Sequence, residues 1–282
     1  MTDLLDAFQL PFMLRALVTL LVLAAAAGTV GVMINLRRLE FLTDGLTHAV
    51  FPGLVLGFLA AGEPGLLPGA LVIALLSSVL LTLLQRRGIG DQSLIAILLT
   101  AFFSIGVILV STQQGYSGQL SEMLFGRLLS ITDSQITITS VLVALAVLAV
   151  TVTWRQQVFR AFDAGGARAS GLRSALLDSV LNGAVVLVVV AASAAVGTLL
   201  VLAVLIVPGA AARLVVPRIG GAVLVATAFA AVTSVLGLMF AWQLSMDLDV
   251  QAAPGGVVAL TMIAVYLLFL AVYALVPRFG RR

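Results

Sequence analysis

Two ionisable residues, Asp44 and His48, stand out because they lie in a stretch of the sequence that is otherwise almost entirely apolar. In a helix, residues four apart lie on one face, about one turn from each other. A carboxylate and an imidazole at this spacing can bind one divalent cation. His48, the only histidine of the chain, follows Arg38 by about ten residues, which corresponds to roughly 15 Å of helix. The pattern therefore predicts a cation site deep in the apolar stretch.

The same pair has an alternative, structural role. His48 would then hydrogen-bond a neighbouring helix, and Asp44 would cap the start of its own helix. Pro52 and Gly53 follow shortly after His48 and indicate a kinked or broken helix. Membrane proteins tolerate irregular backbone mainly where it lines a cavity. This context favours the cation site.

The composition indicates that the helices carrying these residues lie in lipid. The chain has 62% hydrophobic and 10% charged residues, and its mean hydropathy is +1.22. That leaves too little polar surface for a soluble globule. Apolar runs of roughly 20 residues, enough to cross the hydrocarbon core of a bilayer, recur along the chain. They fall at about 14–35, 44–61, 66–84, 93–111, 135–153, 176–194, 197–216, 221–243 and 256–276.

These runs predict an all-α fold, a polytopic bundle of about eight or nine transmembrane helices. The runs are unbroken, whereas the strands of a membrane barrel alternate apolar and polar residues over about ten positions. No stretch remains for a soluble domain, so residues 1–282 are expected to form a single transmembrane domain in contact with the lipid bilayer.

The arginines predict the topology of the bundle. All fifteen basic residues are arginine, and most lie in alternate connections between the apolar runs. By the positive-inside rule these connections face the cytoplasm. Nine crossings result if residues 176–216 form a hairpin that turns near residues 194–197, with the N-terminus outside. Eight crossings is the alternative, with the second arm short or re-entrant or the N-terminal segment interfacial. Arg15 lies on the wrong side and would have to snorkel.

The residue types that are missing exclude some chemistry. Without lysine, the chain cannot contain a phosphate-binding loop of the form GxxxxGK[ST]. Without cysteine, it has no disulfide and no thiolate metal site. The chain is therefore not expected to be an enzyme, and any ATP hydrolysis would belong to a separate polypeptide. Neither a permanently bound cofactor nor a nucleic-acid partner is expected.

The longest basic connection runs from Trp154 to Arg173. It contains Phe159, Phe162 and Leu172 among arginines, which is typical of a short amphipathic element. The alternative is a solvated basic loop attracted to anionic lipid.

At several of these positions the sequence resembles the permease subunits of the manganese, zinc and iron importers of the ATP-binding cassette (ABC) class. The stretch from Leu42 to Gly53 is similar to the D-A-x-S-H-A-V-L-P-G pattern of that family and retains both Asp44 and His48. Further matching stretches lie at 124–129, 162–171 and 196–212. Gly45 and Thr47 replace the family's small residue and serine, and Ala164-Gly165-Gly166 stands where the family has acidic residues.

The resemblance implies a fold and an assembly. The fold would be that of a type II ABC importer permease, with two permeases over two cytoplasmic ABC ATPase subunits in the bacterial cytoplasmic membrane. An extracytoplasmic solute-binding protein would deliver the metal. The loop at about 154–174 would be the coupling loop, with Phe162, Asp163 and Gly171 at the ATPase contact.

The ligand chemistry agrees with such a dimer. One Asp and one His are too few ligands for a cation, but a two-fold axis would supply a second pair from another copy or from a paralogue. Four oxygen and nitrogen ligands suit Mn²⁺, Fe²⁺ or Zn²⁺ better than Cu⁺. Because the imidazole must be neutral to bind metal, metal binding should weaken in acid.

The expected function is therefore a permease subunit that moves manganese, zinc or iron ions, powered by a separate ATPase. A secondary, ion-coupled divalent metal transporter is the alternative, although it would need more intramembrane carboxylates and internal repeats than the sequence offers. A metalloprotease of the HExxH type is excluded because the chain has one histidine.

Overall fold

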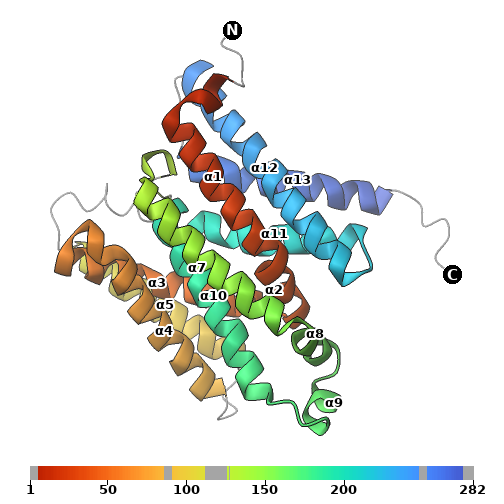
Figure 1. Cartoon of the computed structure of the whole chain (residues 1–282). Coiled ribbons are helices and arrows are strands. Elements are labelled where there is room, and N and C mark those ends of the chain that lie inside the picture. The colour runs from red at the N-terminus through yellow and green to blue at the C-terminus, as the bar shows by residue number, and fades with distance from the viewer. Residues whose placement is uncertain (1–5, 86–90, 112–125, 127, 248–252, 276–282) are drawn as a thin grey trace.

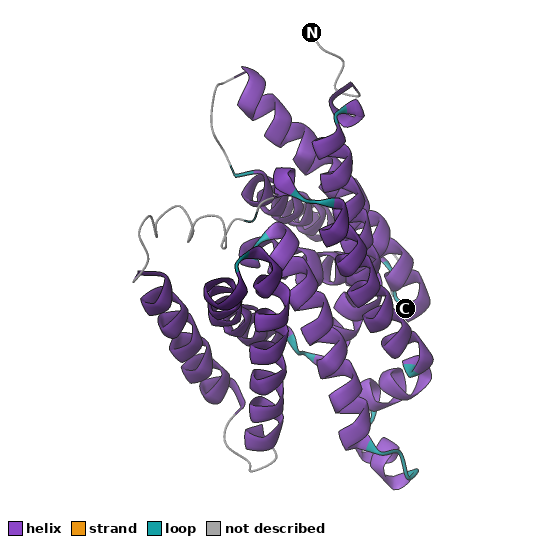
Figure 2. Cartoon of the chain, turned by 60° about the vertical axis from the view of Figure 1, so that its left-hand side comes forward, coloured by secondary structure: helices purple, strands orange, loops and turns teal. Residues whose placement is uncertain are grey.

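The computed structural model describes residues 6–85, 91–111, 126, 128–247 and 253–275. Within these ranges the chain is almost wholly helical and contains no strand (Figure 2). The helices are α1 (Pro11–Ala26), α2 (Val32–Arg37), α3 (Glu40–Ala61), α4 (Leu66–Gln85), α5 (Asp91–Ser111), α7 (Asp133–Val152), α8 (Trp154–Phe162), α9 (Ala164–Ala169), α10 (Ser174–Val196), α11 (Thr198–Val215), α12 (Ile219–Asp247) and α13 (Pro254–Leu275).

Each of the nine predicted apolar runs coincides with a helical segment. Among the described residues, eight of these segments are long and apolar enough to cross a membrane. The ninth is the apolar part of α5, Ile95–Ser111, which is shorter. The chain is an integral, multi-pass membrane protein, as the composition predicts.

The helices form two flanks around a central group. In Figure 1, α3, α4 and α5 lie on one side and α12 and α13 on the other, with α1, α7 and α10 between them. The short helices α8 and α9 lie at the end of the bundle opposite to the start of α1 (Figure 1). The two ends of the bundle therefore differ, because only one of them carries the short helices α8 and α9.

The helices α1 and α2 form one continuous rod through a π-helical turn at Ala27–Gly31. Gly31 in this turn lets α11 approach closely, since a Cβ there would lie 2.4 Å from the carbonyl oxygen of Leu205. One turn later, the buried Asn35 donates from Nδ2 to the carbonyls of Gly31 and Ile206, both at 3.1 Å. Such side-chain donors satisfy backbone groups where lipid offers none. Asn35 thus links α2 to α11 beside Pro208.

A turn joins α10 and α11 where the sequence predicts one, near residues 194–197. Gly197 alone separates the two helices, and its φ of +82° is a conformation that favours glycine. Gly126, with a φ of +79°, lies against this turn, and a Cβ there would be 2.2 Å from the carbonyl carbon of Val196. Two of the sequence stretches singled out above therefore meet in space. Leu124 and Phe125 of the same stretch lie outside the described residues.

Arg15, which the sequence places on the less basic side, forms an ion pair with Asp133. Its Nε and Nη2 donate to Oδ1 and Oδ2 of Asp133, each at 2.8 Å. Asp133 is the first residue of α7, whose start is fixed by a capping box between Thr132 and Gln135. Both charged side chains are substantially exposed, so the pair adds little stability. It does neutralise the one arginine at this end of α1.

The helices α3 and α4 pack backbone to backbone. Gly53 and Gly57 on α3 face Gly65, just before α4, and Gly69 in its first turn. A Cβ on Gly57 would lie 2.0 Å from the carbonyl oxygen of Gly65, and the reverse distance is also 2.0 Å. Small residues at such spacing allow close helix contact in membranes, where packing replaces the hydrophobic effect as the source of association. This pair is the platform that carries Asp44 and His48.

Replacing Gly57 by alanine should therefore lower stability by about 1–3 kcal/mol, because the new methyl group forces the helices apart. Gly183 on α10 is a matched control, since a Cβ there meets no atom within 4 Å. Gly183→Ala should be neutral or stabilising by up to about 1 kcal/mol. Thermal unfolding of the purified variants in detergent measures both effects. Equal unfolding temperatures for Gly57→Ala and Gly183→Ala would contradict the close contact.

Candidate functional site

The structure brings Asp44 and His48 together on one face of α3. Nε2 of His48 lies 3.4 Å from Oδ1 of Asp44. At about 1.5 Å per residue, His48 lies roughly 12 Å along α3 from Glu40. On the surface of the single chain, the His48 side chain is 23% exposed and the Asp44 side chain is 30% exposed. Both donor groups are therefore adjacent, within the membrane-spanning helix and accessible from outside the fold.

Helix α5 holds the histidine ring in place. The ring of Phe103 meets the imidazole edge-on, with centroids 5.5 Å apart and an interplanar angle of 90°. Phe103 in turn contacts the fully buried Phe51 at 5.8 Å. Gly106 makes room for Phe51, since a Cβ there would lie 2.2 Å from its Cδ1. Packing of aromatic rings thus restricts the rotamers of His48 before any ligand binds.

Close packing also fixes the backbone next to Asp44. A Cβ on Gly45 would lie 2.7 Å from Cγ2 of Ile95 on α5, so a larger residue would push the two helices apart. Gly45 takes the position of the small residue that the family pattern has there. The substitution noted in the sequence therefore preserves the contact between α3 and α5.

The structural alternative for Asp44 is wrong in one respect. Helix α3 begins at Glu40 with Leu39 at its N-cap position, so Asp44 lies a full turn inside the helix and does not cap it. Pro52, also inside α3, has no N–H and so cannot donate to the carbonyl of His48 four residues earlier. The region around His48 thus combines an imidazole, a carboxylate and a main-chain carbonyl without its usual helical donor.

Asp44 and His48 are two adjacent side chains of kinds that can bind a metal ion. Over the described ranges, no group of three or more His, Cys, Asp or Glu residues lies close enough to hold a metal ion. The imidazole nitrogen and carboxylate oxygen suit divalent first-row transition metals.

The basic connection predicted from the sequence forms two short helices, α8 and α9. Phe162 ends α8 with a side chain that is 70% exposed. Asp163 caps α9, and its Oδ1 accepts a hydrogen bond of 2.7 Å from the backbone N–H of Gly166. A Cβ on Gly166 would lie 2.3 Å from the Asp163 carboxylate, so a larger residue there would displace the capping side chain. Gly171, with a φ of +82°, ends the turn after α9.

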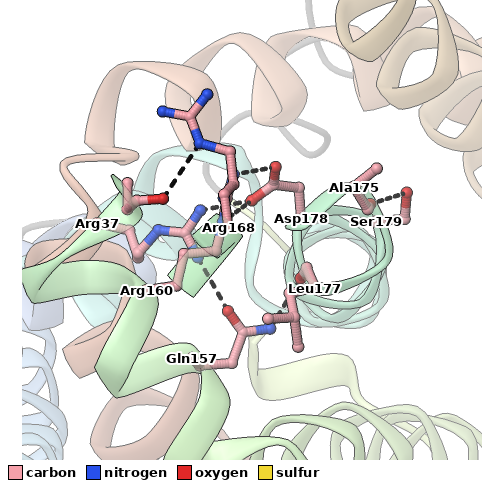
Figure 3. Close-up of polar contacts among 9 residues, drawn as sticks. Arg37, Gln157, Arg160, Arg168, Ala175, Leu177, Asp178 and Ser179 are labelled. Atoms are coloured by element: carbon pink, nitrogen blue, oxygen red, sulfur yellow. Dashed lines mark hydrogen bonds and ion pairs between the residues drawn. The ribbon is translucent and has the colours of Figure 1, made fainter. Parts of the chain in front are cut away.

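A cluster of charges ties α8 to the bundle (Figure 3). Oδ1 of Asp178 on α10 accepts hydrogen bonds from Arg37 Nη2 at 2.5 Å and from Arg160 Nε at 2.8 Å, and its Oδ2 accepts one from Arg160 Nη2. Gln157 on α8 accepts from Arg37 Nη1 at 2.9 Å and donates to the carbonyl of Leu177 at 2.7 Å. Bidentate arginine–carboxylate bonds of this kind are strong and directional. The cluster therefore joins the end of α2, helix α8 and the first turns of α10.

Sequence reasoning missed this cluster, although one signal was available. Asp178 is the only acidic residue between Asp163 and Asp247, and it follows a run of arginines. A lone carboxylate beside several guanidinium groups indicates an ion pair. Its partner Arg37 lies far away in the sequence, so the pair itself could not be inferred.

Comparisons with known proteins agree with this arrangement. The chain is 30% identical over 269 residues to a protein named manganese import system permease protein ScaB from Streptococcus parasanguinis, covering 95% of this chain and 93% of that one. It is 27% identical over 278 residues to the chelated iron transport system membrane protein YfeC of Yersinia pestis, covering 98% and 90%.

The fold is also that of a solved structure. The structure of PsaBC from Streptococcus pneumoniae in complex with Fab matches with a TM-score of 0.83 and 29% identity, over 95% of this chain and 94% of that one. The all-helical permease fold expected from the sequence is thereby confirmed. The model of the ABC 3 transport family matches residues 9–273, which include the α3 pair, the α8–α9 element and the α10–α11 turn. This chain belongs to the ABC 3 transport family.

Proposed function

We propose that the chain, as one transmembrane domain over residues 1–282, is the permease subunit of an ABC importer for divalent transition-metal ions in the bacterial cytoplasmic membrane. The observation that carries the proposal is the Asp44–His48 pair, 3.4 Å apart on α3. Family membership supports the transport class, and the names of relatives point to manganese and chelated iron. Mn²⁺, Fe²⁺ and Zn²⁺ all suit the donor set.

The exposure of the pair supports a dimer of permeases. Ionisable groups inside a membrane are costly when they face lipid, and they normally face a protein interior or a water-filled path. On a single chain, both Asp44 and His48 remain partly exposed. A second permease, identical or paralogous, would cover this face and add a second pair. Two carboxylates then balance the charge of the cation, and four ligands complete its coordination.

Energy would come from separate ABC ATPase subunits docked on α8 and α9. Phe162 offers an exposed aromatic ring for a groove in the ATPase. Asp163 and Gly171 fix the shape of the element, through the α9 cap and the turn that follows it. The Asp178 cluster gives α8 a direct connection to the end of α2, immediately before the helix that carries the proposed ligands. A solute-binding protein on the outer side would supply the metal.

Replacement of the ligands tests the site. Asp44→Asn and His48→Gln keep size and hydrogen bonding but remove the metal-binding charge or nitrogen. Both variants should assemble with the ATPase and unfold at the wild-type temperature. Their affinity for the metal should fall by about tenfold to a hundredfold. Uptake of radioactive Mn²⁺ into proteoliposomes and metal-stimulated ATP hydrolysis are the measurements.

Glu40→Gln is the matched control, because it removes a carboxylate from the same helix one turn before Asp44. It should leave uptake close to wild type. Normal transport of Mn²⁺, Fe²⁺ and Zn²⁺ by well-assembled Asp44→Asn and His48→Gln complexes would exclude the site. Loss of assembly or stability, with the surviving complex still active, would favour the structural role.

Changes in the α8–α9 element test the coupling. Phe162→Ser together with Asp163→Ala should leave ATP hydrolysis by the ATPase measurable but reduce uptake per ATP, because force no longer reaches the permease. Leu176→Ser is the control, since Leu176 is a similarly exposed apolar residue on the first turn of α10. The ratio of metal transported to ATP hydrolysed in proteoliposomes is the measurement. An unchanged ratio in the double variant would refute this docking site.

A further inference from the structure

One recess of the structure gathers positive charge. It has a volume of about 510 Å³ and lies between the ends of α2, α8 and α11 and the start of α12. Four arginines line it, Arg37, Arg38, Arg213 and Arg218, and no Asp or Glu is among its described lining residues. A second recess, about 670 Å³ in volume, is lined by Glu63 and by no arginine. The first recess therefore suits a group that carries negative charge.

Most of the guanidinium donors in this recess have no partner within the described part of the chain. Arg37 already donates to Asp178 (Figure 3). Of the donors of Arg213, only Nη1 has a described partner, a backbone carbonyl at 3.2 Å. Arg38 and Arg218 form no hydrogen bond or ion pair with any residue that the structure describes. Three exposed arginines thus carry charges that no described carboxylate of the chain balances.

The rest of the lining shows what kind of molecule covers these arginines. Val32 is only 1% exposed and Ala222 only 4%, so the recess offers little apolar surface to a lipid chain. Ala161 and Phe162, at the end of α8, line the same recess. The Phe162 side chain is 70% exposed. A protein that covers Phe162 therefore also covers the arginines.

Covering the arginines has an electrostatic cost. Guanidinium groups that leave water without a partner are strongly destabilising, whereas carboxylates offset the cost through paired, directional hydrogen bonds. Three neighbouring positive charges also repel one another until negative charge is added. A protein that docks over α8 and this recess must therefore bring carboxylates with it.

We propose that the ATPase subunit places acidic side chains in this recess, where their carboxylates accept hydrogen bonds from Arg38, Arg213 and Arg218. The inference rests on the proposed docking of the ATPase on α8 and α9. It extends that contact to the end of α2 and to the connection between α11 and α12. The ATPase then holds the chain immediately before α3, the helix that carries Asp44 and His48.

The absence of lysine from the chain allows a direct test. Arg218→Lys places a single side-chain amine in the recess and keeps the charge. A carbodiimide, which joins an amine to a carboxylate in contact with it, is applied to the assembled complex of permease and ATPase. Mass spectrometry of the digested complex should find an amide between position 218 and an Asp or Glu of the ATPase. Arg15→Lys is the matched control and should give no adduct with the ATPase, because the start of α1 lies at the opposite end of the bundle (Figure 1).

Removal of charge tests the strength of the contact. Arg38→Asn is combined with Arg218→Gln, and asparagine is chosen because it tolerates the φ of +54° at position 38. The affinity of the ATPase for this permease in nanodiscs should fall by about tenfold and depend less steeply on salt. The unfolding temperature of the double variant should stay close to that of wild type. Arg15→Gln should leave the affinity of the ATPase unchanged.

Two results would overturn the proposal. One is the absence of an ATPase adduct at position 218 in a complex that hydrolyses ATP, or an adduct there only with the permease itself. The other is an unchanged ATPase affinity in the Arg38→Asn, Arg218→Gln variant. If Phe162→Ser with Asp163→Ala still weakens ATPase binding in that case, docking on α8 and α9 stands and only the recess is excluded. If neither double variant changes the affinity, the docking site itself is wrong.

Discussion

Backbone hydrogen bonds constrain this structure more than any other interaction, because lipid cannot replace a donor or acceptor that the helices leave free. Two departures from regular helix are packed between helices or supported by a side chain. The π-helical turn of α1–α2 packs against α11, and Asn35 donates to the carbonyl of Ile206 beside Pro208. The turn at Gly197 lies under Gly126. Gly126, Gly197 and Pro208 lie in two of the stretches that resemble the family, 124–129 and 196–212.

The charged residues of the bundle are also paired with one another, mainly at its two ends. At the end of the bundle that carries α8, Asp178 is shared between Arg37 and Arg160, so this end keeps an excess of positive charge even after pairing. At the other end of α1, Arg15 is neutralised by Asp133. Between the two ends lies the ionisable pair of Asp44 and His48. Among the described residues, the contact with the Phe103 ring is the interaction that links this pair to another helix. That contrast separates the proposed ligands from the charges that hold the fold.

Features set by local pattern could be predicted from the sequence. The apolar runs follow from local composition, and the turn near 194–197 follows from the alternation of arginine-bearing connections. The shared face of Asp44 and His48 follows from spacing along a helix, and the amphipathic element at 154–174 from its aromatic residues among arginines. Contacts between distant segments could not be predicted, because no local pattern encodes them. The Arg15–Asp133 pair, the Asp178 cluster and the facing glycines of α3 and α4 are of this kind. The capping role considered for Asp44 failed because the helix begins one turn earlier, at Glu40.

The glycine contact between α3 and α4 has a mechanical consequence. Where two helices touch through their backbones, there are no side chains between them whose rotamers could change, so the pair resists internal sliding. Any displacement applied near Arg38, which follows α2 with a left-handed backbone just before α3, is then transmitted to both helices as a rigid body. Asp44 and His48 would keep their 3.4 Å separation throughout such a movement. If α3 and α4 move together in this way, the hinges of the transporter would lie at the two ends of the α3–α4 pair and not within it.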